Sequence, residues 1–430
     1  MKRRTFLAGT ASAFAATQFS PLSAADGPSK LRLAVIGVAN RGAANLAGVE
    51  SENIVALCDV DQGNLEKALK RVPGAELFQD YRVMLDQFKD LDGVVVSTPD
   101  HHHAPATMRA LQRGLPVYCE KPLTHTVAEA RAITNMAREK GVATQMGTQI
   151  HAGENYRRVV EKIRAGVIGD VHHVHVWVGK GWGSTSVPKP GGSAPAGLAW
   201  NLWLGPAEDR PYTKGYHPAN WRSYRDFGTG TLGDMGCHYM DLPFWALGLR
   251  YPKRVVAEGA EADSECCPLG LKVSYEFAAS ETHDEVKFTW YDGDLCPKGK
   301  LEGIKIPRSG VLFVGDKGKM VATYGDHSIE MTSASKVTTP KPVETIAPSV
   351  GHHQEWLNAI RDDKAARPLC QFDYSGPLTE SVLLGTVAHQ IGHAIQWSGE
   401  AARIIDDAEA QALLDKSYRT GWDLMATASA

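Results

Sequence analysis

The feature that most constrains the fold of this chain is a regular alternation, from residue 31 to residue 149, of short apolar runs with helix-like segments. The apolar runs cover residues 31–36, 54–58, 93–97, 116–119 and 142–146. Helical patterns lie between or after them, at residues 41–49, 64–71, 105–112 and 127–140. Strands that are apolar at nearly every position are buried on both faces, and their alternation with helices indicates parallel pairing. The stretch therefore predicts a parallel sheet covered by helices on both faces.

Proline and glycine help to place the ends of these helices. We expect the third helix to begin at Pro105, because proline is favoured in the first turn of a helix. Gly114 and Gly141 follow helical patterns directly and are expected to end them, because glycine is the preferred residue just past a helix.

Beyond residue 150 the pattern changes. One helix is expected at residues 155–165, and strand-like stretches then follow at 171–178, 254–260, 271–277, 286–290 and 310–315. A last helix is expected at residues 378–397. Strands that follow one another without helices predict a mostly antiparallel sheet. We therefore expect an α/β chain with two domains, a nucleotide-binding domain at residues 30–150 and an α/β domain with an open, mostly antiparallel sheet at residues 151–430.

Composition excludes several classes of partner. The 430 residues carry a net charge of −3, which gives no basic field for nucleic acid. No apolar run past residue 25 approaches the roughly 20 residues that a membrane-spanning helix needs. The seven cysteines form no Cys-x-x-Cys pair, so a zinc ribbon or redox motif is not indicated. Cys266, Cys267 and Cys296 could supply one disulfide in an oxidising compartment.

The first 25 residues have the three-part pattern of an export signal. A positive start is followed by a weakly apolar, alanine-rich stretch and by small residues at positions 23–25. Arg3-Arg4 followed by Thr-Phe-Leu resembles the twin-arginine signal; an ordinary secretion signal with two arginines is the alternative. We expect the mature protein to begin near Asp26 and to act in the periplasm, without a lipid anchor because no cysteine lies near the cleavage position.

A glycine-bearing turn joins the first apolar run to the first helix. The dinucleotide-binding fingerprint, Gly-x-Gly-x-x-Gly, matches here at Gly37 and Gly42, while Ala39 departs from the second glycine. The amides that open the helix would then face a pyrophosphate. Asp59 follows the second run, where an acid binds the ribose hydroxyls and repels a 2′-phosphate, so NAD is expected rather than NADP. The alternative is a generic turn beside a surface aspartate.

Two further polar segments follow the third and fourth runs: residues 98–103 (Thr-Pro-Asp-His-His-His) and residues 120–122 (Glu-Lys-Pro). Ligands in parallel sheets bind at the carboxyl ends of the strands. A lysine there can donate to a hydroxyl that is losing its proton. The residues expected to contact the cofactor are Gly37, Ala39, Asn40, Arg41, Gly42, Asp59, Thr98, Pro99, Asp100, His103, Glu120, Lys121 and Gln149.

A third cluster contains Asp234 and His238, whose spacing places both on one face if the segment is helical. Histidine can exchange a proton near neutral pH, and aspartate can orient its ring. A helix with a plain His–Asp hydrogen bond is the alternative. The same spacing could bind a metal, but no third ligand is indicated, and we expect none. Aromatic-rich segments that include Trp221 and Arg222 could either stack on a sugar ring or pack loops together.

Together these residues resemble the Gfo/Idh/MocA oxidoreductase family, named for glucose-fructose oxidoreductase and inositol dehydrogenase. The resemblance covers nearly all of the chain after the signal, and its most specific motif is Glu120-Lys121-Pro122. It implies a Rossmann domain and a C-terminal α/β domain whose open sheet often packs subunits together, hence a homo-oligomer. It also implies NAD(P)-dependent oxidation or reduction at a carbinol of a sugar, polyol or cyclitol.

The resemblance also implies roles for individual residues. Lys121 would lie between cofactor and substrate hydroxyl, and His238 would be the acid/base with Asp234 as its partner. His103 and Glu120 would lie on the cofactor side. The expected catalytic residues are thus Lys121, His238 and Asp234, and the expected substrate-binding residues are Lys121, Trp221, Arg222, Asp234 and His238.

Two other functions stay open. One branch of the superfamily hydrolyses glycosides with transient use of NAD; it carries export signals and often an Arg-Gly pair like Arg41-Gly42, but it lacks the lysine that this chain has at position 121. Export favours such a redox-neutral cycle, because the periplasm has no free NAD pool and a bound cofactor must be regenerated on the protein. A non-catalytic sugar-binding protein is the other alternative, which intact Lys121 and His238 disfavour.

Overall fold

The computed structural model describes residues 29–332, 344–362 and 366–425. The expected export signal at residues 1–25 and the expected mature start near Asp26 lie outside these ranges. In the described part of the chain, no helix combines the length and the apolar character needed to cross a membrane.

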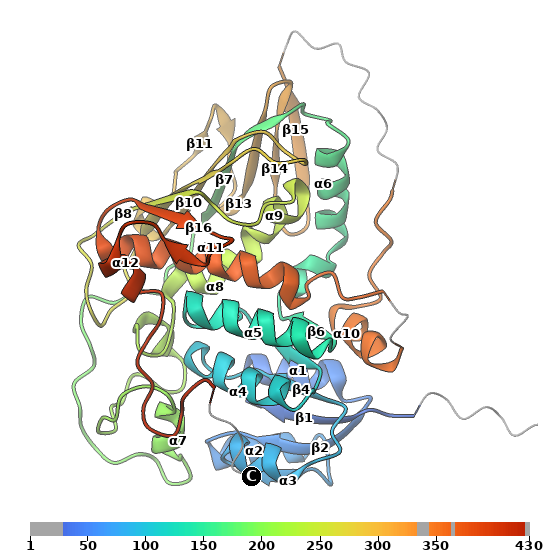
Figure 1. The fold of residues 1–430 in the computed structure, drawn as a ribbon, viewed down its shortest axis with the longest axis vertical. Coiled ribbons are helices and arrows are strands. Elements are labelled where there is room, and N and C mark those ends of the chain that lie inside the picture. The colour runs from blue at the N-terminus through green and yellow to red at the C-terminus, as the bar shows by residue number, and fades with distance from the viewer. Residues whose placement is uncertain (1–28, 333–343, 363–365, 426–430) are drawn as a thin grey trace, which may run out of the picture. The chain divides into compact units, whose positions relative to one another are not determined.

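The first half of the chain builds a six-stranded, all-parallel sheet with the strand order β3-β2-β1-β4-β5-β6 (Figure 1). Its strands are β1 (Arg32–Ile36), β2 (Asn53–Cys58), β3 (Glu76–Phe78), β4 (Gly93–Val96), β5 (Val117–Cys119) and β6 (Thr144–Met146). Every residue of β4 is buried, as expected of a strand covered on both faces. This is a Rossmann-type sheet, which confirms the expected N-terminal fold.

Five helices connect these strands: α1 (Arg41–Val49), α2 (Gln62–Leu69), α3 (Tyr81–Gln87), α4 (Asp100–Gln112) and α5 (Val127–Lys140). Helix α5 begins with a capping box between Thr126 and Glu129 and ends at Gly141, whose φ is +65°. Helix α4 corrects the expected start at Pro105, because it begins at Asp100. Proline removes only one backbone donor there, and the ring nitrogens of the preceding histidines anchor the first turn to backbone carbonyls.

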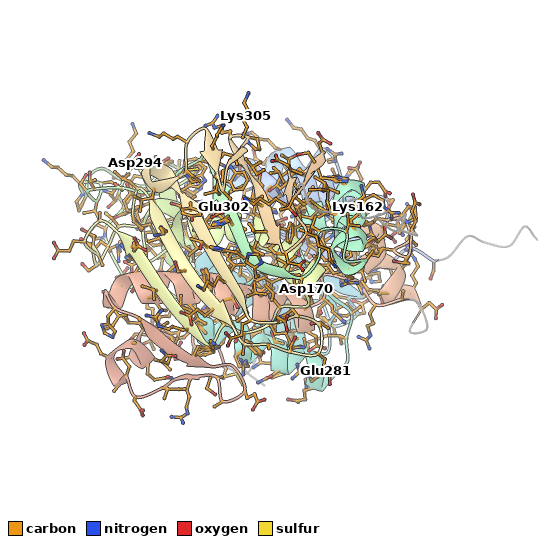
Figure 2. The ribbon with its side chains drawn as sticks, turned by 90° about the horizontal axis from the view of Figure 1, so that it is seen from above. Lys162, Asp170, Glu281, Asp294, Glu302 and Lys305 are labelled. Carbon is orange, nitrogen blue, oxygen red and sulfur yellow. The ribbon has the colours of Figure 1, made fainter. Side chains whose placement is uncertain are left out.

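The second half builds a nine-stranded sheet with the order β15-β14-β13-β7-β10-β9-β8-β16-β17. Its strands are β7 (Val171–Val178), β8 (Arg254–Gly259), β9 (Leu271–Phe277), β10 (Val286–Asp292), β13 (Ser309–Gly315), β14 (Gly318–Ala322), β15 (His327–Met331), β16 (Ile395–Ser398) and β17 (Arg403–Ile404). Neighbours pair antiparallel except for β7 and β10, which are parallel, so the expected mostly antiparallel sheet is confirmed. Figure 2 looks onto strands of this sheet.

Helices lie between the two sheets (Figure 1). They include α8 (Gly230–Tyr239) and α11 (Phe372–Ile391), and α11 packs against α5, α8 and β8. Helix α6 (Glu154–Arg164) lies beside the nine-stranded sheet, near β14 and β15, and packs against α9 (Asp241–Leu247). The expected last helix was too long at its end, because Gly392 adopts a left-handed conformation with φ +76° and Trp397 belongs to β16.

The described fold also contains three further α-helices, α7 (Trp200–Leu204), α10 (His352–Arg361) and α12 (Ala408–Ala412), three short 3-10 helices, and the hairpin of β11 (Lys300–Leu301) with β12 (Ile304–Lys305). Leu301 and Ile304 of the hairpin pack on Trp177 and Leu312, and so cover apolar side chains on one face of the nine-stranded sheet. All seven cysteines are free thiols, so the disulfide considered for Cys266, Cys267 and Cys296 does not form.

Candidate active site

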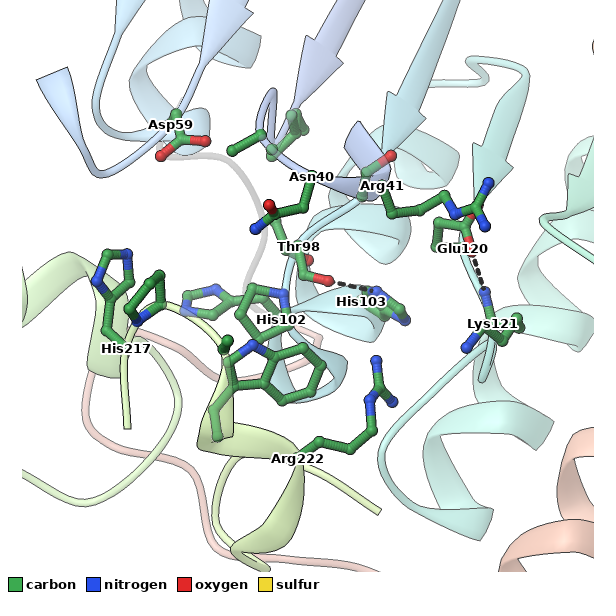
Figure 3. A pocket seen from close by; sticks show the side chains of 18 of the residues that line it. Asn40, Arg41, Asp59, Thr98, His102, His103, Glu120, Lys121, His217 and Arg222 are labelled. Atoms are coloured by element: carbon green, nitrogen blue, oxygen red, sulfur yellow. Dashed lines mark hydrogen bonds between the residues drawn. The ribbon is translucent and has the colours of Figure 1, made fainter. Parts of the chain in front are cut away.

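A cavity of about 830 Å³ opens at the carboxyl ends of the parallel strands. Eleven of the residues expected to contact a cofactor line it: Gly37, Ala39, Asn40, Arg41, Asp59, Thr98, Pro99, His103, Glu120, Lys121 and Gln149. The second half of the chain contributes the expected substrate-side residues Trp221, Arg222, Asp234 and His238. Figure 3 shows Asp59 and His217 at one end of the cavity and Glu120 and Lys121 at the other.

The turn after β1 has the geometry that a pyrophosphate needs. Gly37 has φ +79°, and a Cβ there would lie 2.5 Å from the carbonyl oxygen of Ser97, so only glycine fits. A Cβ at Gly42 would clash with the carbonyl of Gly37; Gly42 therefore packs α1 onto the turn instead of lining the cavity. No acidic side chain lies in the first turn of α1 and no side chain caps its amides. The Gly42 amide donates to the carbonyl of Ala39 at 2.8 Å, whereas no hydrogen bond within the described residues engages the amides of Arg41 and Ala43, which are open to an anion.

Asp59 lies at the end of β2 and lines the cavity. Its Oδ2 accepts from the backbone nitrogen of Val38 at 3.1 Å, and its Oδ1 accepts from that of Asp61 at 3.0 Å. Burial raises the pKa of this carboxyl group, while those hydrogen bonds act in the opposite direction. The carboxyl group is thus held in one orientation, beside the position where a ribose would lie.

Glu120 organises the polar wall beside Lys121. Its Oε1 accepts from Gln149 Nε2 at 2.6 Å and from Asn45 Nδ2 at 3.0 Å. His103 stands next to this wall, with Nδ1 2.6 Å from the carbonyl oxygen of Pro122 and Nε2 2.8 Å from that of Thr98. These bonds fix the loop between β5 and α5, and with it the backbone that carries Lys121.

Asp100 does not line the cavity, which corrects its expected role as a cofactor contact. Its side chain is fully buried, and both carboxylate oxygens accept from Arg222 Nη1 at 2.9 Å. Thr229 also donates to Oδ2, at 2.7 Å. The carboxylate is thereby hydrogen-bonded within the protein, and it fixes Arg222 at the cavity wall.

Asp234 is the centre of a buried charge cluster. Its Oδ1 accepts from Lys121 Nζ at 2.5 Å, and its Oδ2 accepts from Trp182 Nε1 at 2.8 Å. Arg222 Nε lies 3.4 Å from Oδ1 and Lys180 Nζ 3.6 Å from Oδ2. Burial alone would raise the pKa of Asp234, but the charges of Arg222 and Lys121 outweigh it and hold that pKa well below its usual value. The carboxylate is therefore ionised and fixes the position of Lys121.

His238 lies on α8 and lines the same end of the cavity as Lys121. The helix confirms that Asp234 and His238 share one face, yet the described structure contains no hydrogen bond between them, because Asp234 is engaged by Lys121 and Trp182. The Nδ1 of His238 is buried and has no hydrogen-bond partner among the described residues. Burial and the nearby Lys121 ammonium hold the pKa of His238 well below its usual value. The ring is therefore a neutral imidazole at the cavity wall.

Sequence reasoning missed several residues of this cavity. Lys180 and Trp182 follow β7 and reach Asp234, and Tyr324 follows β14 with its ring centroid 6.4 Å from that of His238. Trp422 lines the cavity as well, and so does Trp203, which belongs to one of the aromatic-rich segments noted in the sequence. The Lys-Gly-Trp sequence directly after the predicted strand at residues 171–178 was the one available signal.

The cavity fits a dinucleotide. A phosphate would meet the open amides of α1, and the carboxyl group of Asp59 suits a ribose diol. Thr98 Oγ1 is buried at the cavity and has no hydrogen-bond partner among the described residues, which leaves a polar atom for a ligand. No described group of at least three metal-ligating side chains lies in this cavity; the one such group in the described chain, His151, Asp241 and Cys370, is buried elsewhere.

Comparisons with known proteins agree with this geometry. A family model for the Gfo/Idh/MocA "oxidoreductase family, NAD-binding Rossmann fold" matches residues 31–148. A second one, for the "oxidoreductase family, C-terminal alpha/beta domain", matches residues 162–424. The WlbA dehydrogenase of Bordetella pertussis, solved with NADH and UDP-GlcNAcA, superposes with a TM-score of 0.61 at 18% identity, over 86% of this chain and 99% of that one. At this identity the likeness concerns the fold.

Curated relatives match over shorter segments. A glycosyl hydrolase family 109 protein of Stenotrophomonas maltophilia is 28% identical over 188 residues, which are 40% of this chain and 41% of the relative. An inositol 2-dehydrogenase of an Arthrobacter species is 29% identical over 153 residues, 34% of this chain and 45% of the relative. The chain thus spans less than half the length of these relatives.

Proposed function

The chain belongs to the Gfo/Idh/MocA family of NAD-binding oxidoreductases, and on that premise we propose that it transfers a hydride at a carbinol of a sugar, polyol, cyclitol or glycoside. The observation that carries the proposal is the arrangement around His238. Its neutral ring lines the cavity near the buried pair of Lys121 and Asp234. Removing a hydride from a carbinol requires a base for the hydroxyl proton and a donor for the oxygen.

Each of these residues has a distinct part. When bound, NAD supplies the hydride acceptor. The Lys121 ammonium has three donor hydrogens, and its two bonds to Asp234 leave one for the substrate oxygen. That positive charge stabilises an oxygen that is losing its proton. His238 then receives the proton, and Asp234 acts as a positioning residue for Lys121 instead of for the histidine.

The cavity also suits a cofactor that stays on the protein. Trp203, His217 and Trp422 line its Asp59 end. Trp422 comes from the last described segment of the chain and is held by Arg82, whose guanidinium lies 3.8 Å from the indole centroid and donates to the carbonyl of Gly421 at 3.1 Å. Aromatic walls from distant segments favour retention of the nucleotide through successive turnovers, as internal recycling of NAD requires.

A redox-neutral glycoside hydrolase or lyase, acting through a keto-sugar, is the second candidate. The relative from Stenotrophomonas maltophilia carries the name of a glycosyl hydrolase family, and this favours the candidate. The presence of Lys121 favours oxidoreduction as the net reaction. Both candidates begin with the same oxidation, so the site residues keep their parts in either case.

Product analysis separates the two candidates. The nucleotide released by denaturing the purified protein is identified first, and we expect NAD. The native protein is then incubated with a panel of sugars, polyols and glycosides. A keto-sugar or polyol product supports net oxidoreduction, and a cleaved glycoside supports the second candidate. Absence of bound or bindable NAD would refute both.

We further propose that the protein acts outside the cytoplasm, exported through the twin-arginine signal with its cofactor bound. The support is the sequence pattern at residues 1–25. Replacing Arg3 and Arg4 by lysine should then retain the protein in the cytoplasmic fraction. Subunit packing through the nine-stranded sheet is a further proposal from the family resemblance, which the mass of the purified protein in solution tests.

A further inference from the structure

A second cavity, of about 720 Å³, adjoins the substrate end of the first. The two cavities share Lys180, which lines both. Lys180 Nζ lies 3.6 Å from Asp234 Oδ2 and 5.0 Å from the centroid of the Trp182 ring. Lys180 therefore lies at the boundary of the two cavities, and the second cavity is the neighbouring space for a substrate that extends beyond Lys121 and His238.

The wall of the second cavity is rich in glycine. Five glycines line it: Gly179, Gly181, Gly183, Gly293 and Gly299. At Gly183 and Gly293 an added Cβ would clash with backbone atoms of residues 268 and 269, so these two positions require glycine. Glycines leave their peptide groups uncovered, and uncovered N–H and C=O groups are suitable partners for sugar hydroxyls.

Nine side chains remain on the wall, of which three are cationic, one is acidic and five are apolar or carry a thiol. Lys180, Lys298 and Arg308 face one acid, Asp294. Arg308 Nε donates to the carbonyl oxygen of Gly179 at 2.9 Å, which holds the guanidinium at the wall. Within the described residues, neither Lys298 nor Arg308 forms an ion pair. The second cavity thus carries uncompensated positive charge.

We propose that this cavity is a subsite for a negatively charged sugar unit linked to the reacting sugar, so that the substrate is an acidic glycoside. The inference rests on the proposed function and adds to it the chemistry of the neighbouring unit. Trp182 offers a ring face to the sugar at the junction, and Lys298 with Arg308 recognises a carboxylate or sulfate beyond it. A guanidinium matches the planar geometry of either oxyanion.

The test compares substrates that differ only in charge. Cellobiose is compared with the corresponding disaccharide that has glucuronate at one unit, and with its monosulfated form. Calorimetry measures binding to the NAD-loaded protein, and the KM of each sugar is measured where it is turned over. We expect the acidic disaccharides to bind about tenfold more tightly than cellobiose at low salt, and this preference to shrink at 0.5 M salt. The stronger of the two acidic arms identifies the oxyanion.

Three variants test the inference, and two of them are expected to change the preference for acidic disaccharides in opposite directions. Replacing both Lys298 and Arg308 by glutamine should abolish the preference for acidic disaccharides, while Asp294→Asn should increase it roughly threefold. Lys305→Gln is the matched control, because Lys305 lies on the nearby hairpin strand β12 and lines neither cavity (Figure 2). We expect that control to bind like the wild type.

The outcomes are distinguishable from failure of the proposed function. Equal binding of neutral and acidic disaccharides by the wild type overturns the subsite, even if a neutral sugar is oxidised. Selective binding of the acidic disaccharide that the double variant loses supports the subsite, even if no sugar is turned over. A preference that survives the double variant also overturns it.

Discussion

We expect His238→Ala to lower turnover by roughly 10²- to 10⁴-fold, the usual range for removal of a general acid/base. The reason is that the His238 ring is neutral and lines the cavity near Lys121. Because the lost interaction belongs to the transition state, kcat and kcat/KM should fall together. Steady-state kinetics on the substrate identified by product analysis measures both.

NAD content separates a chemical role of His238 from a structural one. The dinucleotide contacts expected at Gly37 and Asp59 lie elsewhere in the cavity, so the variant should keep the wild-type NAD content. The pH profile adds a second criterion. Because the pKa of His238 lies well below its usual value, the acid limb of wild-type kcat/KM should fall well below pH 6.5. An acid limb near pH 6.5 in the wild type would refute the assignment. So would turnover close to that of the wild type in His238→Ala with its NAD retained.

If His238 is not the base, other side chains are candidates, and they differ in how close they lie to Lys121 and in how free they are to accept a proton. His217 lines the cavity, but Figure 3 shows it beside Asp59 at the opposite end from Lys121. Asp241 is fully buried and bonded to His151 and Tyr374. Tyr239 stacks on Tyr324, with ring centroids 4.6 Å apart. Tyr324 lines the cavity next to His238 and becomes the first candidate.

The strands of the parallel sheet could be predicted because their pattern is unambiguous. A strand such as β4 is buried at every residue and has no polar face, so its sequence is a continuous apolar run. Strand β3 and helix α3 were missed, because a three-residue strand with no buried residue has almost no pattern. In the second half the edge strands β15 and β17 were missed as well, since they are short and only partly buried. Strand β16 overlaps the end of the expected last helix, and β14 was missed although four of its five residues are buried.

The part of the candidate site that lies directly after the parallel strands could be predicted. Residues just past consecutive parallel strands must meet at one edge of the sheet, which brings Gly37, Asp59 and Lys121 to the same cavity. Trp182 and Trp422 could not be found this way, because loop packing and the path of the C-terminal segment bring them there. Asp100 illustrates the reverse error: it stands at the correct edge, but α4 begins at this residue and turns its carboxylate to Arg222.

We expect the protein to lose stability steeply between pH 7 and pH 5, because several histidines are buried in neutral form. Burial lowers the pKa of His102 to about 4 and that of His352 to about 3, and it lowers that of His101 strongly as well. In the unfolded chain these groups take up protons near pH 6.5. As the pH falls below 6.5 the unfolded state therefore binds more protons than the folded state, and the free energy of unfolding decreases.

At pH 5 the pH is about 1.5 units below the histidine pKa of the unfolded chain, so each such histidine contributes about 2 kcal/mol of this loss. Total stabilities of about 5–15 kcal/mol make that a large effect. Asp292 acts in the opposite direction, because burial raises its pKa to about 7 and the folded state then binds the additional proton. The buried histidines outnumber such carboxyl groups, so the net change is destabilisation. Urea unfolding at pH 7 and pH 5 measures it.

A single substitution isolates the histidine contribution. His352 accepts from or donates to neutral groups only, with Nε2 2.8 Å from the carbonyl of Met146 and Nδ1 3.3 Å from Gln145 Nε2. Glutamine does not titrate, so His352→Gln should lower stability at pH 7 yet reduce the loss between pH 7 and pH 5 by about 2 kcal/mol. His172→Gln, at an exposed histidine, is the control and should leave the pH dependence unchanged. An unchanged pH dependence in His352→Gln would mean that His352 has the same pKa in the folded and the unfolded protein, because only such a histidine contributes no slope, and it would refute burial of His352 in neutral form.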